Sequence, residues 1–262
     1  MHRIDSIDDP RIAPYRNLRD RTLRGESLFV TEGRVLTLRL LEGPFEAESV
    51  LVADEYAEEF ARRTGDRVPL YVAPEPLLLE IVGFPFHRGV LGAGRRKAPL
   101  RPDELLARFD LAARLRLVVL PEVTKPENLG LVFRSAAAFG IDAVLLGQWS
   151  CDPLSRRALR VSMGGSLQAP WTRSDDILAD LATLRSRWRV ELAAAVLDPG
   201  AEPLAEVRWP DRAAVLLGNE TEGLRDRLLW LADRRVTIPM RPGVDSLNLG
   251  VAAGVFLYAM SR

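Results

Sequence analysis

Residues 115–146 read LRLVVLPEVTKPENLGLVFRSAAAFGIDAVLL and indicate the fold class. The stretch begins and ends with apolar runs, 115–120 and 143–146, of the kind that is buried on both faces of a parallel sheet. Between them, the apolar residues of 129–136 recur at helical spacing, and Gly140 is a typical helix end. The stretch therefore predicts a strand, a helix and a second strand of an open α/β fold.

The same alternation continues towards the C-terminus. Further apolar runs predict strands at 190–197, 213–217 and 236–240. Asp152-Pro153 and Ser174 are typical helix starts between them. We therefore expect a parallel sheet flanked by helices throughout the second half.

The first half has a separate, mixed pattern. Strand-like and helix-like segments alternate over 27–73, which predicts a small α/β unit. A basic, proline-containing stretch, RRKAPLRPDELLARF at 95–109, follows it and is typical of a linker. The predicted organisation is a first domain at 1–98, a linker at 99–114 and a second domain at 115–262.

Composition limits the chemistry. The chain has 262 residues, a formal net charge of zero, one cysteine and two histidines. These counts exclude a disulfide framework and a cysteine-rich zinc cluster and leave little for a histidine-based triad, so we expect no metal. The chain has no apolar run of about eighteen residues and no apolar signal-peptide core, which predicts a cytoplasmic protein without a membrane partner.

The loop and helix after residue 120 contain the first candidate ligand-binding residues. Asn128 stands at or near the predicted helix N-cap, and Arg134 lies almost two turns inside the helix. Helical side chains lean towards the N-terminus, so Arg134 could reach back to a phosphate or polar substrate beside Asn128. The alternative is an ordinary capped helix with a solvated arginine.

Two later strand ends also carry candidates. In LLGNETEGL at 216–224, Gly218 would let a ligand approach the backbone. After the 236–240 strand, Ser246 and Asn248 would either cap the last helix or hold a ligand over its end. Small residues at 250, 253 and 254 predict that this helix packs closely against another element.

The common nucleotide and hydrolase motifs are absent. The sequence has no GxGxxG turn, GxxxxGK[ST] loop, HExxH helix or GxSxG elbow. A doubly wound nicotinamide enzyme would need the first of these, which disfavours that alternative.

Taken together, three ordered motifs resemble the SpoU (TrmH-like) branch of the SPOUT methyltransferases. They are PENLGLVFRSAAAFG, LLGNETEGL and IPMRPGVDSLNLGVAAGVFLY, and DPLSRRALRVSMGGSLQAPW between them is similar to a further family segment. The resemblance covers 115–262. More weakly, SLFVTEGRVLTLRLLEGPFEAESVLVAD is similar to the family's ribosomal-protein-like substrate-binding domain.

The resemblance implies a trefoil-knotted, parallel-sheet domain that binds S-adenosylmethionine, acts as a homodimer and methylates a ribose 2′-hydroxyl of RNA. Ribosomal RNA is the expected substrate; transfer RNA, or a non-catalytic RNA-binding role, are the alternatives. By motif, the implied cofactor-binding residues are Leu197, Gly218, Ile238, Met240 and Leu247.

The resemblance also implies roles for five catalytic residues. Arg134 would bind an RNA phosphate and polarise or deprotonate the hydroxyl, and Asn128 would orient it. Glu220 would hold the site together, while Ser246 and Asn248 would position the substrate and the helix end.

Phosphate contacts are expected from arginines, against the equal alternative that these are ordinary solvated side chains. The candidates are Arg24, Arg34, Arg156, Arg157 and Arg160.

Overall fold

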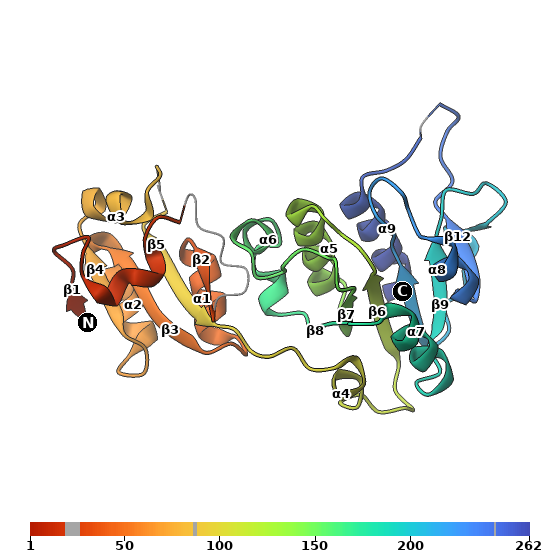
Figure 1. Cartoon of the computed structure of the whole chain (residues 1–262), viewed down its shortest axis with the longest axis horizontal. Helices are drawn as coiled ribbons and strands as arrows, with labels where there is room; N and C mark the ends of the chain where they lie inside the picture. Colours follow the sequence, from red (N-terminus) through yellow and green to blue (C-terminus); the bar gives the residue numbers. More distant parts are fainter. Residues whose placement is uncertain (19–26, 86–87, 244) are drawn as a thin grey trace. The chain divides into compact units, whose positions relative to one another are not determined.

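A computed structural model describes residues 1–18, 27–85, 88–243 and 245–262. The chain divides into two compact units. The first consists of Met1–Ala98 together with Leu154–Gln168, and the second of Pro99–Pro153 together with Ala169–Arg262. Figure 1 labels most of the helices and strands of both units.

The first unit is built on a five-stranded mixed sheet with the order β1-β4-β3-β5-β2. Strand β4 is parallel to β1 and β3, whereas β5 is antiparallel to β3 and β2. Its strands are β1 His2–Arg3, β2 Leu28–Glu32, β3 Ala47–Ala53, β4 Leu70–Ala73 and β5 Val90–Arg95. Its helices are η1 Pro10–Tyr15, α1 Arg34–Glu42, η2 Asp54–Tyr56, α2 Ala57–Thr64, α3 Glu75–Val82, α6 Arg156–Val161 and η3 Gly165–Leu167.

Strand alternation gives this first sheet a core on each face. Leu51 of β3 is buried with Ile81 of α3. Its neighbour Val50 is buried on the other side with Phe60 of α2. Successive strand residues point to opposite faces, so one apolar run supplies both cores.

The second unit is built on a seven-stranded, wholly parallel sheet with the order β10-β12-β9-β11-β6-β7-β8. Its strands are β6 Leu115–Leu120, β7 Ala143–Leu146, β8 Trp171–Arg173, β9 Glu191–Ala195, β10 Glu202–Pro203, β11 Arg212–Leu216 and β12 Arg234–Thr237. Its helices are α4 Pro102–Leu106, α5 Pro126–Ala138, α7 Ile177–Ser186, η4 Leu204–Glu206, α8 Asp226–Leu231 and α9 Leu249–Ser261.

Helices cover both faces of this parallel sheet (Figure 1). Val118 and Val215 belong to the core shared with α5 and α9, whereas Leu117 and Leu216 belong to the core shared with α4, α7 and α8. Burial on both faces explains why the strands are unbroken apolar runs. The predicted α/β fold with a parallel sheet is confirmed.

The predicted strands at 115–120 and 143–146 have the observed bounds of β6 and β7. The other three are present but begin or end up to three residues from their predicted limits. The short strands β1, β8 and β10 and the interior strand β5 had not been predicted. The helix starts also differ: α7 is capped by Asp176 rather than Ser174, and α6 by Ser155.

The two units differ from the predicted domains in two segments. The predicted linker 99–114 belongs to the second unit, because Leu105 and Leu106 of α4 are buried in its core. Segment 154–168 belongs to the first unit, where Arg156 pairs with Glu32 of β2 and lies over the Phe84 ring.

Within the described residues, no helix combines the length and the apolarity that crossing a lipid bilayer requires.

The predicted close packing of the last helix involves α5. A Cβ added at Gly250 would lie 2.5 Å from Leu131 Cβ, whereas one at Gly254 would lie 3.5 Å from Ser135 Oγ. The first distance is a clash and the second is an ordinary contact. Only Gly250 is therefore needed for this packing.

We predict that Gly250→Ala destabilises the protein by about 1–3 kcal/mol, because the methyl group forces α5 and α9 apart. Gly254→Ala is the matched control and should stabilise by up to about 1 kcal/mol through helix propensity. Urea unfolding of both variants measures this difference. Equal stability of the two would contradict the packing argument.

Candidate functional site

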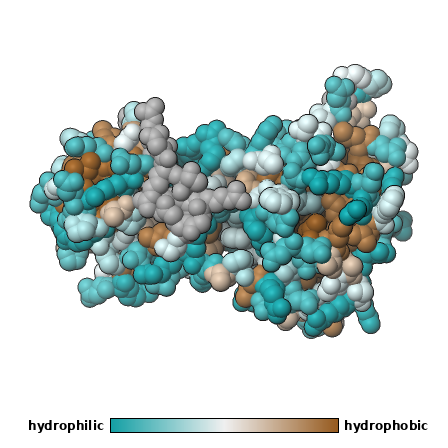
Figure 2. Space-filling view, viewed as in Figure 1, coloured by the Kyte–Doolittle hydropathy of each residue, from teal (hydrophilic) through white to brown (hydrophobic). Residues whose placement is uncertain are grey.

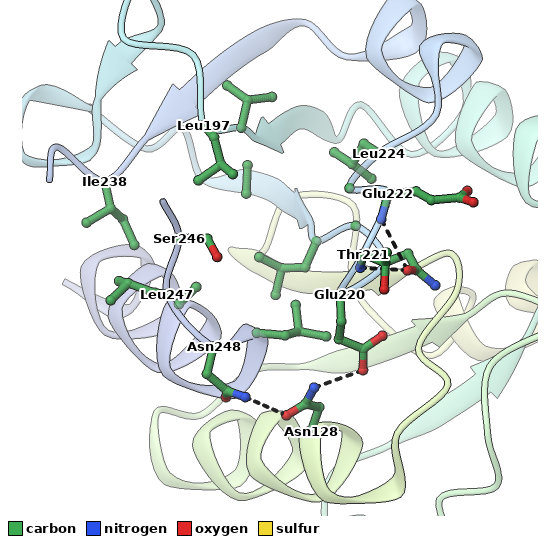
Figure 3. A pocket seen from close by; sticks show the side chains of 18 of the residues that line it. Asn128, Leu197, Glu220, Thr221, Glu222, Leu224, Ile238, Ser246, Leu247 and Asn248 are labelled. Carbon is green, nitrogen blue, oxygen red and sulfur yellow. Dashed lines mark hydrogen bonds between the residues drawn. The ribbon is translucent and has the colours of Figure 1, made fainter. Parts of the chain in front are cut away.

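A cavity of about 530 Å³ lies in the second unit where β9, β11 and β12 end. The loops after these strands and the first turns of α5 and α9 form its wall (Figure 3). Open parallel sheets place ligands beyond the carboxyl ends of their strands. The cavity is therefore the candidate functional site.

A row of three hydrogen-bonded side chains lies along one wall of this cavity (Figure 3). Asn248 Nδ2 donates to Asn128 Oδ1 at 2.9 Å, and Asn128 Nδ2 donates to Glu220 Oε1 at 2.9 Å. The three residues belong to α9, α5 and the loop after β11, which are far apart in the sequence. The row therefore ties three separate loop regions together, and we call it the Asn–Asn–Glu row.

Asn248 has a second role as the N-cap of α9. Its Oδ1 accepts from the backbone N–H groups of Gly250 at 2.9 Å and Val251 at 3.4 Å. These bonds use the side-chain oxygen and leave the amide nitrogen for Asn128. The cap thereby fixes which end of the Asn248 amide faces the cavity.

Glu220 ends the row with one oxygen unused. Its Oε2 is buried and has no hydrogen-bond partner among the residues that the structure describes. A buried carboxylate oxygen without a donor costs free energy, so such an atom commonly marks a place where a ligand supplies the missing donor. Among the described residues, Glu220 Oε2 is therefore a covered acceptor of the row that lacks a donor.

A tight turn places Glu220. Asn219 and Gly223 exchange backbone hydrogen bonds of 2.9 Å, and the Asn219 side chain accepts from the Thr221 N–H at 2.8 Å. A Cβ on Gly218 would lie 2.2 Å from the Gly223 carbonyl carbon. Position 218 therefore has to be glycine for the turn itself to close. This requirement holds whether or not a ligand approaches the backbone there.

The opposite wall of the cavity is largely apolar. It includes Leu197, Ile238, Met240 and Leu247, all predicted cofactor contacts. Leu197 is 62% exposed although it is a large apolar residue. Its position indicates a surface that a ligand with an apolar face could cover.

Cys151 lies close enough to Glu220 to interact with it electrostatically. Burial, with a smaller contribution from the Glu220 charge, raises the pKa of the Cys151 thiol to about 11. The thiol is therefore uncharged at neutral pH and a poor nucleophile.

Arg134 is the one predicted catalytic residue outside the cavity wall. Asn128, Glu220, Ser246 and Asn248 line the cavity, whereas Arg134 is exposed on α5. Helix α5 begins at Pro126 with Lys125 as its N-cap, so Asn128 lies inside the first turn rather than at the cap. Six residues further along, at about 100° per residue, Arg134 points about 120° away from Asn128.

The predicted RNA-contacting arginines all lie in the first unit's sequence ranges. Arg34 pairs with Glu59 at 2.7 Å, and Arg156 pairs with Glu32. Arg157 is exposed and Arg160 is half-buried. Arg24 lies outside the described residues.

Sequence reasoning missed some residues of the wall. They include Lys125, which lies beside Asn128, and Thr221 and Glu222 in the turn after β11. All three fall within the segments that had been singled out. The turn geometry that brings them to the cavity leaves no residue-level signal in the sequence.

Comparisons with known proteins agree with this geometry. Residues 116–258 match the model of the SpoU rRNA Methylase family. The chain belongs to this family.

Two relatives illustrate the similarity. The chain is 36% identical to an uncharacterized tRNA/rRNA methyltransferase of Mycobacterium bovis, over 97% of this chain and 90% of the relative. It is 33% identical to the 23S rRNA (guanosine-2′-O-)-methyltransferase RlmB of Acinetobacter baylyi, over 90% of this chain and 93% of the relative.

Solved structures show the same fold. The AdoMet-bound rRNA methyltransferase of Sinorhizobium meliloti is 25% identical to this chain and superimposes with a TM-score of 0.80. The match covers 98% of this chain and 96% of the other.

The cavity suits S-adenosylmethionine by its size and its walls. Small-molecule sites typically measure about 300–1,000 Å³ and combine apolar walls with a few polar groups. Here Leu197, Ile238 and Leu247 provide the apolar wall, and the loop backbones provide hydrogen-bonding groups at its edge. The residues present therefore fit this cofactor.

We predict that the two roles of Asn248 can be separated by substitution. Asn248→Ala should destabilise the protein by about 1 kcal/mol, because α9 loses its N-cap. Asn248→Ser should keep most of that stability, since a serine hydroxyl also caps a helix but cannot reach Asn128. Urea unfolding measures both; equal losses would show that the bond to Asn128 stabilises more than the cap.

Proposed function

We propose that this protein is an S-adenosylmethionine-dependent RNA 2′-O-methyltransferase that modifies ribosomal RNA. The observation that carries the proposal is the Asn–Asn–Glu row, whose three residues line a cavity that fits the cofactor and which ends in a carboxylate oxygen without a partner among the described residues. The printed name of the RlmB relative, a 23S rRNA guanosine-2′-O-methyltransferase, supports the ribose and the ribosomal RNA.

S-adenosylmethionine, when bound, supplies a methyl group on a sulfonium, which leaves as a neutral thioether. Leu197, Ile238 and Leu247 would hold it, with Gly218 and Met240 beside them. The task of the protein is then to align the ribose oxygen with the methyl carbon and to receive the hydroxyl proton.

Glu220 is the best-placed acceptor of that proton. Asn128 fixes Glu220 through Oε1, which leaves Oε2 to accept a hydrogen bond from the 2′-hydroxyl. Glu220 Oε2 would receive the hydroxyl proton as the ribose oxygen takes up the methyl group. Ser246, at the cavity edge, would position the ribose.

Arg134 would bind an RNA phosphate from the exposed side of α5. A guanidinium is always charged at neutral pH, which suits it for holding a phosphate better than for removing a proton. Further phosphate contacts in the first unit would come from Arg34, Arg156, Arg157 and Arg160. A phosphate contact by Arg24 stays a prediction from the sequence.

A homodimer is the proposed assembly, and α9 offers a surface for it. Val251, Val255 and Tyr258 are 51%, 41% and 46% exposed. Their spacing of four and three residues places them on one helix face, opposite the face buried against the sheet. Apolar side chains also gather around the end of the second unit where β9, β12 and α9 lie (Figure 2). A symmetric pair would bury the α9 face.

Three further parts of the proposal rest on the family resemblance. We propose a substrate-binding role for the first unit, a knot in the second, and a cytoplasmic location where the RNA is found. Transfer RNA is the second candidate substrate, because relatives carry the printed name tRNA/rRNA methyltransferase. A non-catalytic RNA-binding role is disfavoured by the complete Asn–Asn–Glu row.

The proposed function is tested with RNA from a strain that lacks the protein. Purified protein and tritiated S-adenosylmethionine should label ribosomal RNA, and the labelled position should resist alkaline cleavage because its 2′-oxygen is blocked. Label in transfer RNA alone would favour the second substrate. Cofactor binding without any label would favour the non-catalytic role.

We predict that Glu220→Gln lowers kcat in this assay by about a hundredfold or more, the usual contribution of a general base. Glutamine keeps the acceptor for Asn128 and removes only the proton acceptor. Arg134→Ala should abolish transfer by weakening RNA binding, with cofactor affinity nearly intact. Glu206→Gln and Arg208→Ala, both exposed and outside the cavity, are controls. Normal turnover in Glu220→Gln or in Arg134→Ala would contradict the role assigned to the substituted residue.

We predict that Val255→Arg gives a monomer, because a charge would be buried in the proposed interface. Leu111→Arg is the control, since Leu111 is also an exposed apolar residue but lies outside α9. Light scattering coupled to size-exclusion chromatography measures both masses. A monomeric wild-type protein, or a dimeric Val255→Arg, would refute the α9 interface.

A further inference from the structure

A second cavity, of about 320 Å³, lies beyond the ends of β6, β7 and β8 in the second unit. Glu122, Trp149 and Asp175 follow these three strands in turn and line it. Asn219 and Gly223 line both this cavity and the cofactor cavity, so the turn after β11 is a wall that the two share. We call the second one the Trp149 cavity.

Trp149 is unusually exposed for so large an apolar side chain, at 67%. Its indole N–H nevertheless has a hydrogen-bond partner in the same loop. With the Gln148 amide oriented to satisfy both neighbours, the indole N–H donates to Gln148 at 2.8 Å, and Gln148 donates to the Asp175 carbonyl at 3.0 Å. An exposed ring held in one orientation is a preorganised stacking surface.

The loop that carries Trp149 is also held rigidly. Arg173 of β8 donates to the carbonyls of Gly147, Ser150 and Cys151 at 2.9, 2.7 and 3.0 Å. The Ser150 hydroxyl donates to the Leu120 carbonyl at 3.0 Å. These bonds anchor both sides of Trp149 without burying it, so the loop's rigidity does not come from packing of the indole.

The charges around the cavity favour a nucleobase over a phosphate alone. Arg225 is paired with Glu122 at 2.9 Å, and Asp176 caps α7. In the described part of the chain, the Asp175 carboxylate and the Arg227 guanidinium have no ion pair. The Asp175 carboxylate can therefore accept hydrogen bonds from the N–H groups of a base, and the Arg227 guanidinium can bind a phosphate of the sugar–phosphate backbone.

We infer that the Trp149 cavity binds a nucleobase of the RNA substrate, stacked on the Trp149 indole, next to the ribose that is methylated. The inference rests on the proposed function. A volume of about 320 Å³ is at the small end of ligand sites, which suits one nucleoside and not a longer segment. The shared turn then separates a stacked base on one side from the reacting ribose at Glu220 on the other.

The test compares four proteins: wild type, Trp149→Ala, Trp149→Phe and Trp230→Ala. Trp230 is 79% exposed and lines neither cavity, so it controls for the loss of an exposed indole. The probe is a fluorescein-labelled pool of random ten-nucleotide RNA, and affinity is read from fluorescence anisotropy. Binding of S-adenosylmethionine to each variant reports whether the cofactor cavity is intact.

Trp149→Ala should weaken RNA binding about five- to a hundredfold, the range for loss of one base–aromatic stack. Trp149→Phe should retain most of the affinity, because phenylalanine also stacks, and Trp230→Ala should match wild type. Cofactor affinity should be the same in all four. Wild-type affinity in Trp149→Ala, or an equal loss in Trp230→Ala, would overturn the inference.

This readout does not depend on methyl transfer. If wild type transfers no methyl group but its RNA binding still requires Trp149, the proposed reaction fails and the nucleobase site stands. If wild type methylates RNA and Trp149→Ala has the same RNA affinity and the same kcat/KM, the reaction stands and the nucleobase site fails.

Discussion

Burial of the parallel sheet on both faces is the constraint on which the rest of the second unit depends. Val118 and Leu117 alternate into two different cores, so neither face of the sheet is free to bind a ligand. The strand ends are the remaining place where backbone groups and polar side chains can meet a small molecule. Both cavities lie there, beyond β9, β11 and β12 in one case and beyond β6, β7 and β8 in the other.

At those strand ends, three polar side chains hold one another in place by hydrogen bonds. Asn128 both donates and accepts within the Asn–Asn–Glu row, so rotating its amide would break both bonds at once. Asn248 is fixed in turn by the α9 backbone. The orientation of Glu220 is thus set, through Asn128, by a helix cap on a distant segment.

The sequence predicted which segments meet at the cavity, but it did not predict the short strands or the direction of Arg134. Long apolar runs such as 115–120 are strong signals, whereas β8 and β10 are too short to form a pattern. Strand β5 escaped prediction because Gly92 and Gly94 disfavour strands, although added Cβ atoms there would lie 2.7 Å from Thr31 and 2.5 Å from Phe29. The direction of Arg134 follows from its separation of six residues from Asn128, because both lie inside α5 and six residues at about 100° each place their side chains about 120° apart.

The strand order also has a consequence for how the chain is made. Strand β6 leaves the ribosome first among the seven, yet it ends in the middle of the sheet between β7 and β11. Residue 115 pairs with residue 212, so one edge of β6 has to wait for almost a hundred residues of synthesis. Pairing over such sequence separation is slow, and an apolar strand with an open edge is prone to join the wrong chain. The edge of β6 that pairs with β11 therefore stays open for longer during synthesis than the edge that pairs with β7.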